Sequence, residues 1–234
     1  MKSLVQHISA LFLLFCAGNV ASQSFYQERI SRDNILSIGL GPSFAYLDNG
    51  GQYKELNFEI KPSISVALTR KLNPTFDLRT SLGYQYISSG GNPSPDVIED
   101  WIENSASFTA KGPVYYFDVM PSMYIIKFSN HMHRSLFNLY GGFGLGVMHS
   151  RTEQTKSFDS EEVPTKYEIT TGYIPARAGL TYRLGPYSDI AGEGTMMWTF
   201  TDNLDGNEGF NKFGDVLYQF QVVYRHYFVV KNND

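Results

Sequence analysis

Apolar residues alternate with small or polar residues through most of the chain after residue 33, and this alternation limits the possible folds more than any other feature. In the first stretch Leu36, Ile38 and Leu40 are separated by Ser37 and Gly39. Successive side chains of a β-strand point to opposite faces, so the pattern predicts strands with one apolar and one polar face. Comparable stretches occur at 34–47, 56–69, 76–86, 114–128, 136–149, 166–184, 188–201 and 215–230. The sequence therefore predicts an all-β chain of eight strands, each long enough to cross a membrane when tilted.

Two barrel architectures share this alternation: a soluble barrel with its apolar face inside, and a membrane barrel with its apolar face outside. The polar face distinguishes them, because it consists mostly of Gly, Ser, Thr, Ala and Asn with one or two charges in each strand. A soluble exterior would carry many more Lys and Glu residues, and only 18% of this chain is charged. The composition favours an eight-stranded antiparallel up-and-down transmembrane β-barrel.

The charges on the polar face are expected to line a narrow lumen. An isolated buried charge is costly, so opposite charges in such a lumen should pair. The predicted lumen charge network consists of Glu59, Lys61, Asp77, Arg79, Asp118, Arg177, Arg183, Glu193 and Arg225, with Asp189 on the same face. Each of the arginines Arg79, Arg177 and Arg225 should lie beside an acidic member of this network.

Connections between the predicted strands alternate in length. Short links are expected at 71–75, 129–135 and 185–187, and long links at 47–55, 88–113, 150–165 and 202–214. In membrane barrels the short turns face the periplasm and the long loops face the exterior, so both ends of the chain should lie in the periplasm. The long links hold more acidic than basic residues, which predicts an acidic outer rim.

One long link contains a helical signal. In residues 94–103, Pro95 at the first turn is followed by early acidic residues, a combination that favours the start of a helix. The apolar stripe of this segment, which includes Ile98 and Ile102, is expected to form a lid on the barrel mouth.

The N-terminus has the features of an export signal. Lys2 precedes an apolar run at 8–18, and small residues follow up to Ser22. This run is too short to remain as a membrane anchor, so cleavage is expected after Ser22. The predicted organisation is a signal peptide at 1–22, a periplasmic segment at 23–33, the barrel at 34–230 and a tail at 231–234. The predicted location is the cell outer membrane of a Gram-negative bacterium.

Little in the sequence points to catalysis or to a cofactor. The single cysteine excludes a disulfide framework, and a pI of about 5.7 gives no basic footprint for nucleic acid. His131 and His133 occupy a polar turn that has no nearby carboxylate. His149 and Ser150 are adjacent in a strand, so their side chains should point to opposite faces and not form a catalytic pair. We therefore expect no enzymatic activity and no cofactor.

Four predicted strands contain a proline in their interior, at Pro42, Pro62, Pro121 and Pro175. Proline cannot donate a hydrogen bond to a strand ladder. We expect bulges or lost ladder bonds at these positions, with serine hydroxyls such as that of Ser63 available to the carbonyls left unpaired.

Three segments carry a resemblance to a known family. These are 72–79 (LNPTFDLR), the glycine-rich 139–146 (LYGGFGLG) and 199–205 (TFTDNLD). Together they resemble the outer-membrane barrel family that contains the PorG-type subunit of the type IX secretion system, and more broadly the OmpA-like and opacity-type small barrels. The most specific of the three contributes Thr199, Phe200, Thr201, Asp202, Leu204 and Asp205. The resemblance implies a role in protein secretion, with periplasmic lipoproteins of the secretion ring as partners.

The sequence thus supports a non-enzymatic outer-membrane barrel that acts as a structural or docking component. Its partners are expected to be outer-membrane lipid, lipopolysaccharide and the periplasmic lipoproteins, which would contact 23–33 and the short turns. The alternative is a surface-exposed barrel that binds ligands or neighbours through acidic extracellular loops. A small solute pore and a lipid-A-modifying enzyme are further alternatives; an eight-stranded lumen is usually filled by side chains.

Overall fold

The computed structural model describes residues 33–47, 59–90, 95–103, 109–127, 134–155, 163–205 and 214–228. The expected signal peptide at 1–22, most of the segment at 23–33 and the tail at 231–234 lie outside these described residues. The histidines His131 and His133 lie outside them as well.

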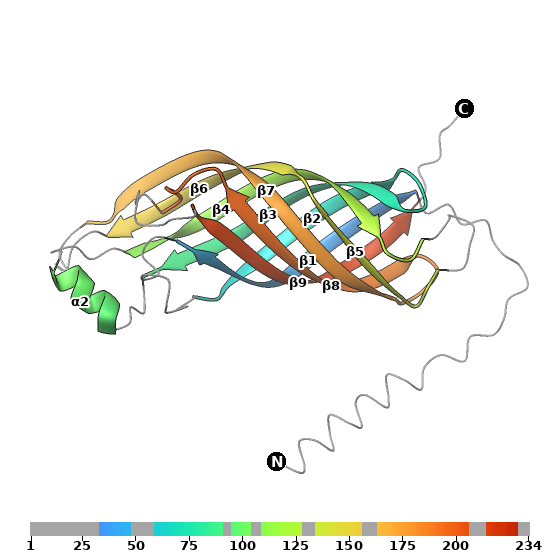
Figure 1. Cartoon of the computed structure of the whole chain (residues 1–234), viewed down its shortest axis with the longest axis horizontal. Coiled ribbons are helices and arrows are strands. Elements are labelled where there is room, and N and C mark those ends of the chain that lie inside the picture. The colour runs from blue at the N-terminus through green and yellow to red at the C-terminus, as the bar shows by residue number, and fades with distance from the viewer. Residues whose placement is uncertain are drawn as a thin grey trace, which may run out of the picture.

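The described chain forms a wall of strands and one helix (Figure 1). The strands are β1 (Asn34–Tyr46), β2 (Lys61–Lys71), β3 (Phe76–Ser89), β4 (Thr109–Tyr124), β5 (Phe137–Phe143), β6 (Leu145–Thr155), β7 (Thr165–Arg183), β8 (Ser188–Thr199) and β9 (Val216–Phe228). The helix α2 spans Pro95–Glu103, which confirms the helix predicted for 94–103. Ile98 and Ile102 on this helix are exposed, and the lid expected from the apolar stripe stays a prediction.

The sheet is antiparallel throughout and closes on itself, because β1 pairs with both β2 and β9. β5 and β6 lie end to end, and both pair with β4 on one side and with β7 on the other. The ring therefore has the eight strand positions that the alternation predicts, with β5 and β6 sharing one of them. This confirms the prediction of an all-β antiparallel barrel.

Gly144 separates β5 from β6, and prolines in both adjacent strands account for the break. Pro175 of β7 faces Gly144, and Pro121 of β4 faces the preceding residue, Phe143. A proline has no amide hydrogen, so neither neighbour can donate there. The register is the same on both sides of the break. The prolines therefore remove ladder bonds without inserting a residue, and the expected bulge does not occur here.

A second interruption lies between β1 and β9. Pro42 faces Pro62 of β2, and the pairing of β1 with β9 is lost beside it. The Ser63 hydroxyl donates to the carbonyl oxygen of Gly41 at 3.0 Å. A serine hydroxyl thus donates a hydrogen bond to a carbonyl next to a proline, as the sequence predicts.

The two faces of the wall differ sharply in chemistry. Side chains on the outer face are apolar and exposed, whereas those on the inner face are mostly polar and buried. The exposed apolar side chains include Leu36, Ile38, Leu40, Ile64, Val66, Leu68, Phe117, Val119, Leu139, Leu145, Val147, Leu180, Phe220 and Val222. A closed barrel with an apolar exterior leaves no unpaired edge in lipid, which is the architecture of a membrane-spanning barrel. No helix in the described ranges is long and apolar enough to cross a membrane.

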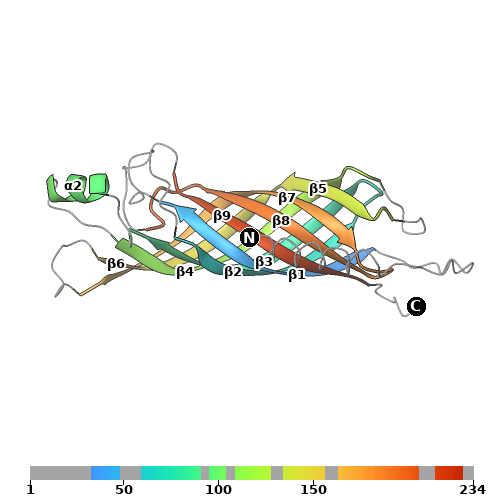
Figure 2. The same ribbon diagram turned by 90° about the horizontal axis from the view of Figure 1, so that it is seen from below.

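The two ends of the barrel also differ. At one end, the links 72–75 and 184–187 lie beside the start of β1 and the end of β9. At the other end lie α2 and the far ends of β6 and β7 (Figure 1 and Figure 2). Short links and chain ends lie on the periplasmic side in membrane barrels, so we refer to this end as the predicted periplasmic end and to the opposite end as the outer end.

The expected strict alternation of short and long links fails at one place. The link between β4 and β5, at 125–136, is longer than the link between β6 and β7, at 156–164. The reasons are that β6 continues to Thr155, into the region predicted to be a loop, and that β4 ends at Tyr124, before the predicted end at 128. Residues 150–155 therefore belong to the wall of the barrel.

Candidate functional site: the lumen and the outer rim

Four buried charges from four strands form a network in the middle of the lumen. The guanidinium of Arg79 on β3 donates to both carboxylate oxygens of Glu193 on β8, at 2.5 and 3.0 Å. Arg177 on β7 donates to both oxygens of Asp118 on β4, at 3.1 and 3.2 Å, and its Nε lies 3.5 Å from Glu193. All four side chains are buried. Two cations and two anions thus alternate across the barrel.

Neutral groups complete the coordination of this network. The Tyr140 hydroxyl donates to Glu193, and the Tyr173 hydroxyl donates to Asp118 at 2.8 Å. Ser81 and Thr195 accept hydrogen bonds from the two guanidiniums at 3.0 to 3.2 Å. A buried ion pair offsets its desolvation cost only when such additional hydrogen bonds are present.

Large aromatic side chains fill the lumen above and below the network, which the sequence reasoning did not predict. Tyr116, Tyr140 and Tyr173 are buried, and each is paired across the ladder with a glycine. A Cβ on Gly83 would lie 2.2 Å from the Tyr116 ring, and similar clashes would occur at Gly179 and Gly146. Each tyrosine ring therefore lies flat over a glycine. Alternation alone places Tyr116 on the face of Asp118 and Tyr173 on the face of Arg177, although residue type does not separate a lumen tyrosine from a lipid-facing one.

A second polar cluster lies at the predicted periplasmic end. Arg134 donates to both oxygens of Asp189 at 2.6 and 2.7 Å, and its guanidinium lies 4.2 Å from the centre of the Tyr227 ring. Arg183 donates to the main-chain carbonyl of Arg134. Sequence reasoning missed Arg134, because it lies in a predicted turn where alternation gives no signal.

The three predicted lumen arginines meet acids in different ways. Arg79 and Arg177 form ion pairs, whereas Arg225 interacts electrostatically with Asp77 without an ion-pair contact among the described residues. It donates to the Tyr124 hydroxyl, and its guanidinium lies 4.8 Å from the centre of the Tyr140 ring. Asp77 is fully buried nearby on β3. The aromatic ring faces stabilise the Arg225 cation, a role that was expected of a carboxylate.

The outer end of the lumen is closed by apolar side chains. They include Ile87, Val114, Met148, Met197, Leu204 and Leu217. Leu204 comes from the family-like segment 199–205 and is fully buried. Its amide donates to Asp215 at 2.7 Å, and its carbonyl accepts from Ser150 at 3.4 Å.

The remaining residues of that segment have different surroundings. The Thr199 hydroxyl lies 2.6 Å from the carbonyl oxygen of Thr201, whereas Phe200 is exposed. Asp205 is fully buried and Asp202 is half-buried. The final predicted network members, Glu59 and Lys61, form a partly exposed ion pair of 3.0 Å before and at the start of β2, away from the central network.

The histidine and serine considered in the sequence do not form a pair. His149 faces outward and contacts the Thr170 hydroxyl at 2.9 Å, whereas Ser150 is buried on the lumen side. Their side chains therefore point to opposite faces, as predicted. Within the described ranges no group of three or more His, Cys, Asp or Glu side chains is arranged to hold a metal ion.

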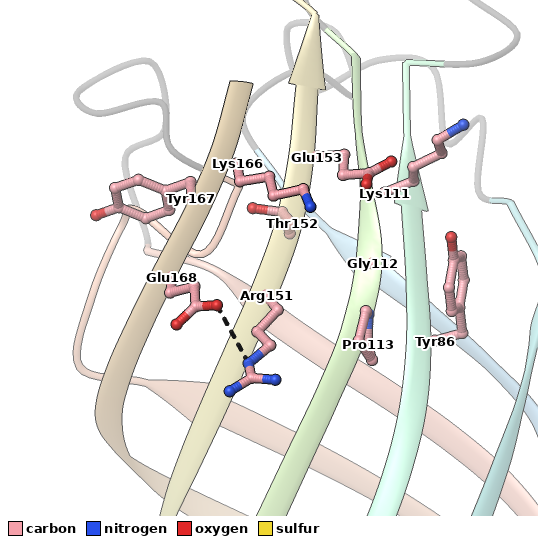
Figure 3. Close-up of a pocket in the computed structure, with 10 residues that line it drawn as sticks. All are labelled: Tyr86, Lys111, Gly112, Pro113, Arg151, Thr152, Glu153, Lys166, Tyr167 and Glu168. Carbon is pink, nitrogen blue, oxygen red and sulfur yellow. Dashed lines mark ion pairs between the residues drawn. The ribbon is translucent and has the colours of Figure 1, made fainter. Parts of the chain in front are cut away.

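A groove of about 340 Å³ lies on the outward face at the outer rim, over β4, β6 and β7 (Figure 3). Its charged lining residues are Lys111, Arg151, Glu153, Lys166 and Glu168. The ladder places Lys111 beside Glu153 and Glu153 beside Lys166, and Arg151 forms an ion pair of 3.3 Å with Glu168. The pairing of β4 with β6 is interrupted at Gly112 and Pro113, which also line the groove.

No protein-family model matches the chain, and no curated protein matches it in sequence. Among solved structures the chain is similar to the Neisserial surface protein A, NspA, with 13% identity, a TM-score of 0.48, and coverage of 83% of this chain and 97% of that one. It is also similar to Ail, the attachment invasion locus protein of Yersinia pestis, solved in complex with the heparin analogue sucrose octasulfate (14% identity, TM-score 0.46, coverage 85% and 99%). A third similar structure is the outer membrane protease OmpT from Escherichia coli (12% identity, TM-score 0.40, coverage 89% and 100%). At these identities the likeness is one of fold. The closed antiparallel ring and its apolar exterior make this chain an outer-membrane β-barrel.

Proposed function

We propose that this protein is a non-enzymatic barrel that acts as a structural or docking component of the outer membrane. The observation that carries the proposal is the filled lumen. The central ion network lies between buried tyrosines, and the outer end is packed with apolar side chains. A lumen occupied in this way leaves the outer surfaces of the barrel for recognition.

The partner that we propose is a periplasmic lipoprotein of a type IX-like secretion system. Support comes from the resemblance of segments 72–79, 139–146 and 199–205 to the PorG-type barrel family. Docking would then use the predicted periplasmic end, where the short links 72–75 and 184–187 lie.

Site-specific photo-crosslinking in whole cells tests this proposal. A photoreactive residue is placed at the exposed turn positions Pro74 and Ser135, and in parallel at the exposed outer positions Glu99 and Val163. Crosslinks from Pro74 and Ser135 to periplasmic lipoproteins, absent from the outer positions, are expected. Crosslinks formed only from the outer positions would contradict periplasmic docking.

A second candidate is a surface-binding barrel, and one observation favours it. β7 continues through 165–172 beyond its last pairing with β8, and β3 continues through 86–89 beyond its pairing with β2. Together with β4 and β6 these ends form a wall that projects at the outer end. Crosslinks from Val163 to extracellular ligands or neighbouring proteins, with none from Pro74, would favour this candidate over the first.

A further inference from the structure

On the outward face of β4 and β6, the side chains change from apolar to aromatic or histidine and then to charged toward the outer rim. Moving outward along β4, Phe117 is followed by Tyr115 and then, past Pro113, by Lys111. Moving outward along β6, Val147 is followed by His149 and then by Arg151. Phe117 pairs with Val147, and Tyr115 pairs with His149, so the changes occur at the same level on both strands.

This sequence of side chains marks the outer boundary of the membrane. Exposed apolar side chains such as Phe117 and Val147 suit the hydrocarbon layer, and tyrosines gather at the interface with the headgroups. Tyr115 and Tyr84 form such a pair, with their ring centres 5.5 Å apart. Alternate residues along a strand are about 6.6 Å apart, and strands of membrane barrels tilt by about 40°, so Arg151 lies about 5 Å above the tyrosine level. That is the height of the headgroups of outer-leaflet lipids.

The groove at this height offers cations on the side that faces lipid. Lys111, Arg151 and Lys166 contribute three positive charges, and Glu153 and Glu168 contribute two negative charges. Arg151 and Glu168 are each more than half exposed, so their ion pair is weak. Arg151 contacts Glu168 and His149 through its Nε, so its two terminal nitrogens can donate to a further acceptor. Arginine presents parallel donors that match a phosphate, and lysine adds a compact charge.

We propose that this groove binds the phosphorylated headgroup of an outer-leaflet glycolipid of the lipid A type. Arg151 contacts the phosphate, Lys111 and Lys166 flank it, and the acyl chains run down the apolar face past Tyr115 and Phe117. The proposal concerns a different surface from the one proposed for periplasmic docking. It does not depend on that docking, and it requires only that this end of the barrel faces outward.

Native mass spectrometry of the full-length barrel, released from detergent after incubation with lipid A, tests the proposal. The test variant is Lys111→Gln/Arg151→Gln. The matched control is Arg70→Gln/Lys127→Gln, which removes one arginine and one lysine from exposed positions near the predicted periplasmic end. Loss of charge-assisted hydrogen bonds should lower the fraction of lipid A bound by the test variant about tenfold, and leave the control unchanged. A heat-dependent shift on a gel verifies that both variants are folded.

Two further arms identify the source of the phosphate. Lipid A from which the phosphates have been removed should bind the unmodified barrel as weakly as lipid A binds the test variant. Excess inorganic phosphate should not displace lipid A, because the acyl chains contribute to binding. Four outcomes would each overturn the proposal. The test variant could bind as much lipid A as the unmodified barrel, or the control could lose as much binding as the test variant. Dephosphorylated lipid A could bind fully, or inorganic phosphate could displace lipid A.

Discussion

Glu193 joins the two lumen arginines, and its environment shows how a single charge can hold distant strands. It accepts from Arg79 and lies within 3.5 Å of Arg177, and these residues are far apart in the chain. Removing one member of a buried ion pair leaves its partner charged and unsolvated, which costs about 3–5 kcal/mol. An exposed pair contributes only about 0–1 kcal/mol.

The substitution Glu193→Gln is therefore expected to destabilise the barrel by about 3–5 kcal/mol. The measurement is the urea midpoint of the heat-shifted band on a gel. Glu168→Gln, which breaks the exposed pair with Arg151, serves as the control and should change the midpoint little. Equal effects of the two substitutions would show that the central network does not stabilise the fold.

The contact between Gly83 and Tyr116 gives a second prediction for a single residue. Gly83→Ala should destabilise the barrel by about 1–3 kcal/mol, because its Cβ would overlap the buried ring. Gly192→Ala is the control, since nothing lies within 4 Å of a Cβ at that position. Unfolding in urea measures both. Adding Tyr116→Ala should abolish the extra cost of Gly83→Ala, and strict additivity of the two changes would argue against the contact.

Among the elements, β5 and β6 form the strand position with the least continuous pairing. Gly144 at their junction lies closely against β4, where a Cβ would be 2.2 Å from the carbonyl oxygen of Val119. The obstacle is backbone, so the neighbour cannot move aside by changing a rotamer. The junction therefore needs glycine for close approach of two strands.

Gly144→Ala should separate β4 from the β5–β6 position locally. Faster amide hydrogen exchange is expected in 145–150 and in the facing part of β4, with little change in β2. Gly185→Ala lies in a turn with space around the Cβ and serves as the comparison. An exchange profile that matches that of Gly185→Ala would disprove the role given to Gly144.

For the whole molecule, closure depends on the pairing of β1 with β9, which runs from Asn34 with Phe228 to Tyr46 with Val216. Without it, both edge strands would expose unpaired backbone groups to lipid. Deleting residues 224–234 should abolish insertion into the outer membrane. Deleting 94–103, the α2 segment whose Ile98 and Ile102 are exposed, should leave a folded barrel.

Heat-dependent migration on a gel, after fractionation of the outer membrane, measures both deletions. A compact, heat-shifted band from the chain that lacks 224–234 would disprove the closure argument. Loss of that band on deleting 94–103 would show that α2 is part of the folding unit.

Alternation was sufficient to predict which face the lumen charges occupy. Which charges form ion pairs depends on how the strands close into a ring, and alternation does not show this. Arg79 and Glu193 are 114 residues apart, and only the positions of β3 and β8 across the lumen bring them together. Tyr116 was missed because a large aromatic residue suits lipid as well as a lumen, and its glycine partner is evident only from the register. Arg134 lies in a turn, where no alternation exists. The outer groove was missed because the outer ends of β4 and β6, at 109–113 and 150–155, were predicted to be loops.

Two of the proline-interrupted junctions have a mechanical consequence. One lies at β1 and the other at β5 and β6, on opposite sides of an eight-position ring. Each interrupts the pairing locally, and a tube with two such weak points opposite each other flattens more easily along one axis than along the other. These points divide the wall into a half-shell of β2, β3 and β4 and a half-shell of β7, β8 and β9. Both central ion pairs, Arg79 with Glu193 and Asp118 with Arg177, run from one half-shell to the other. These ion pairs hold the two half-shells together inside the lumen, and they oppose a change in the cross-section of the barrel under the lateral pressure of the bilayer.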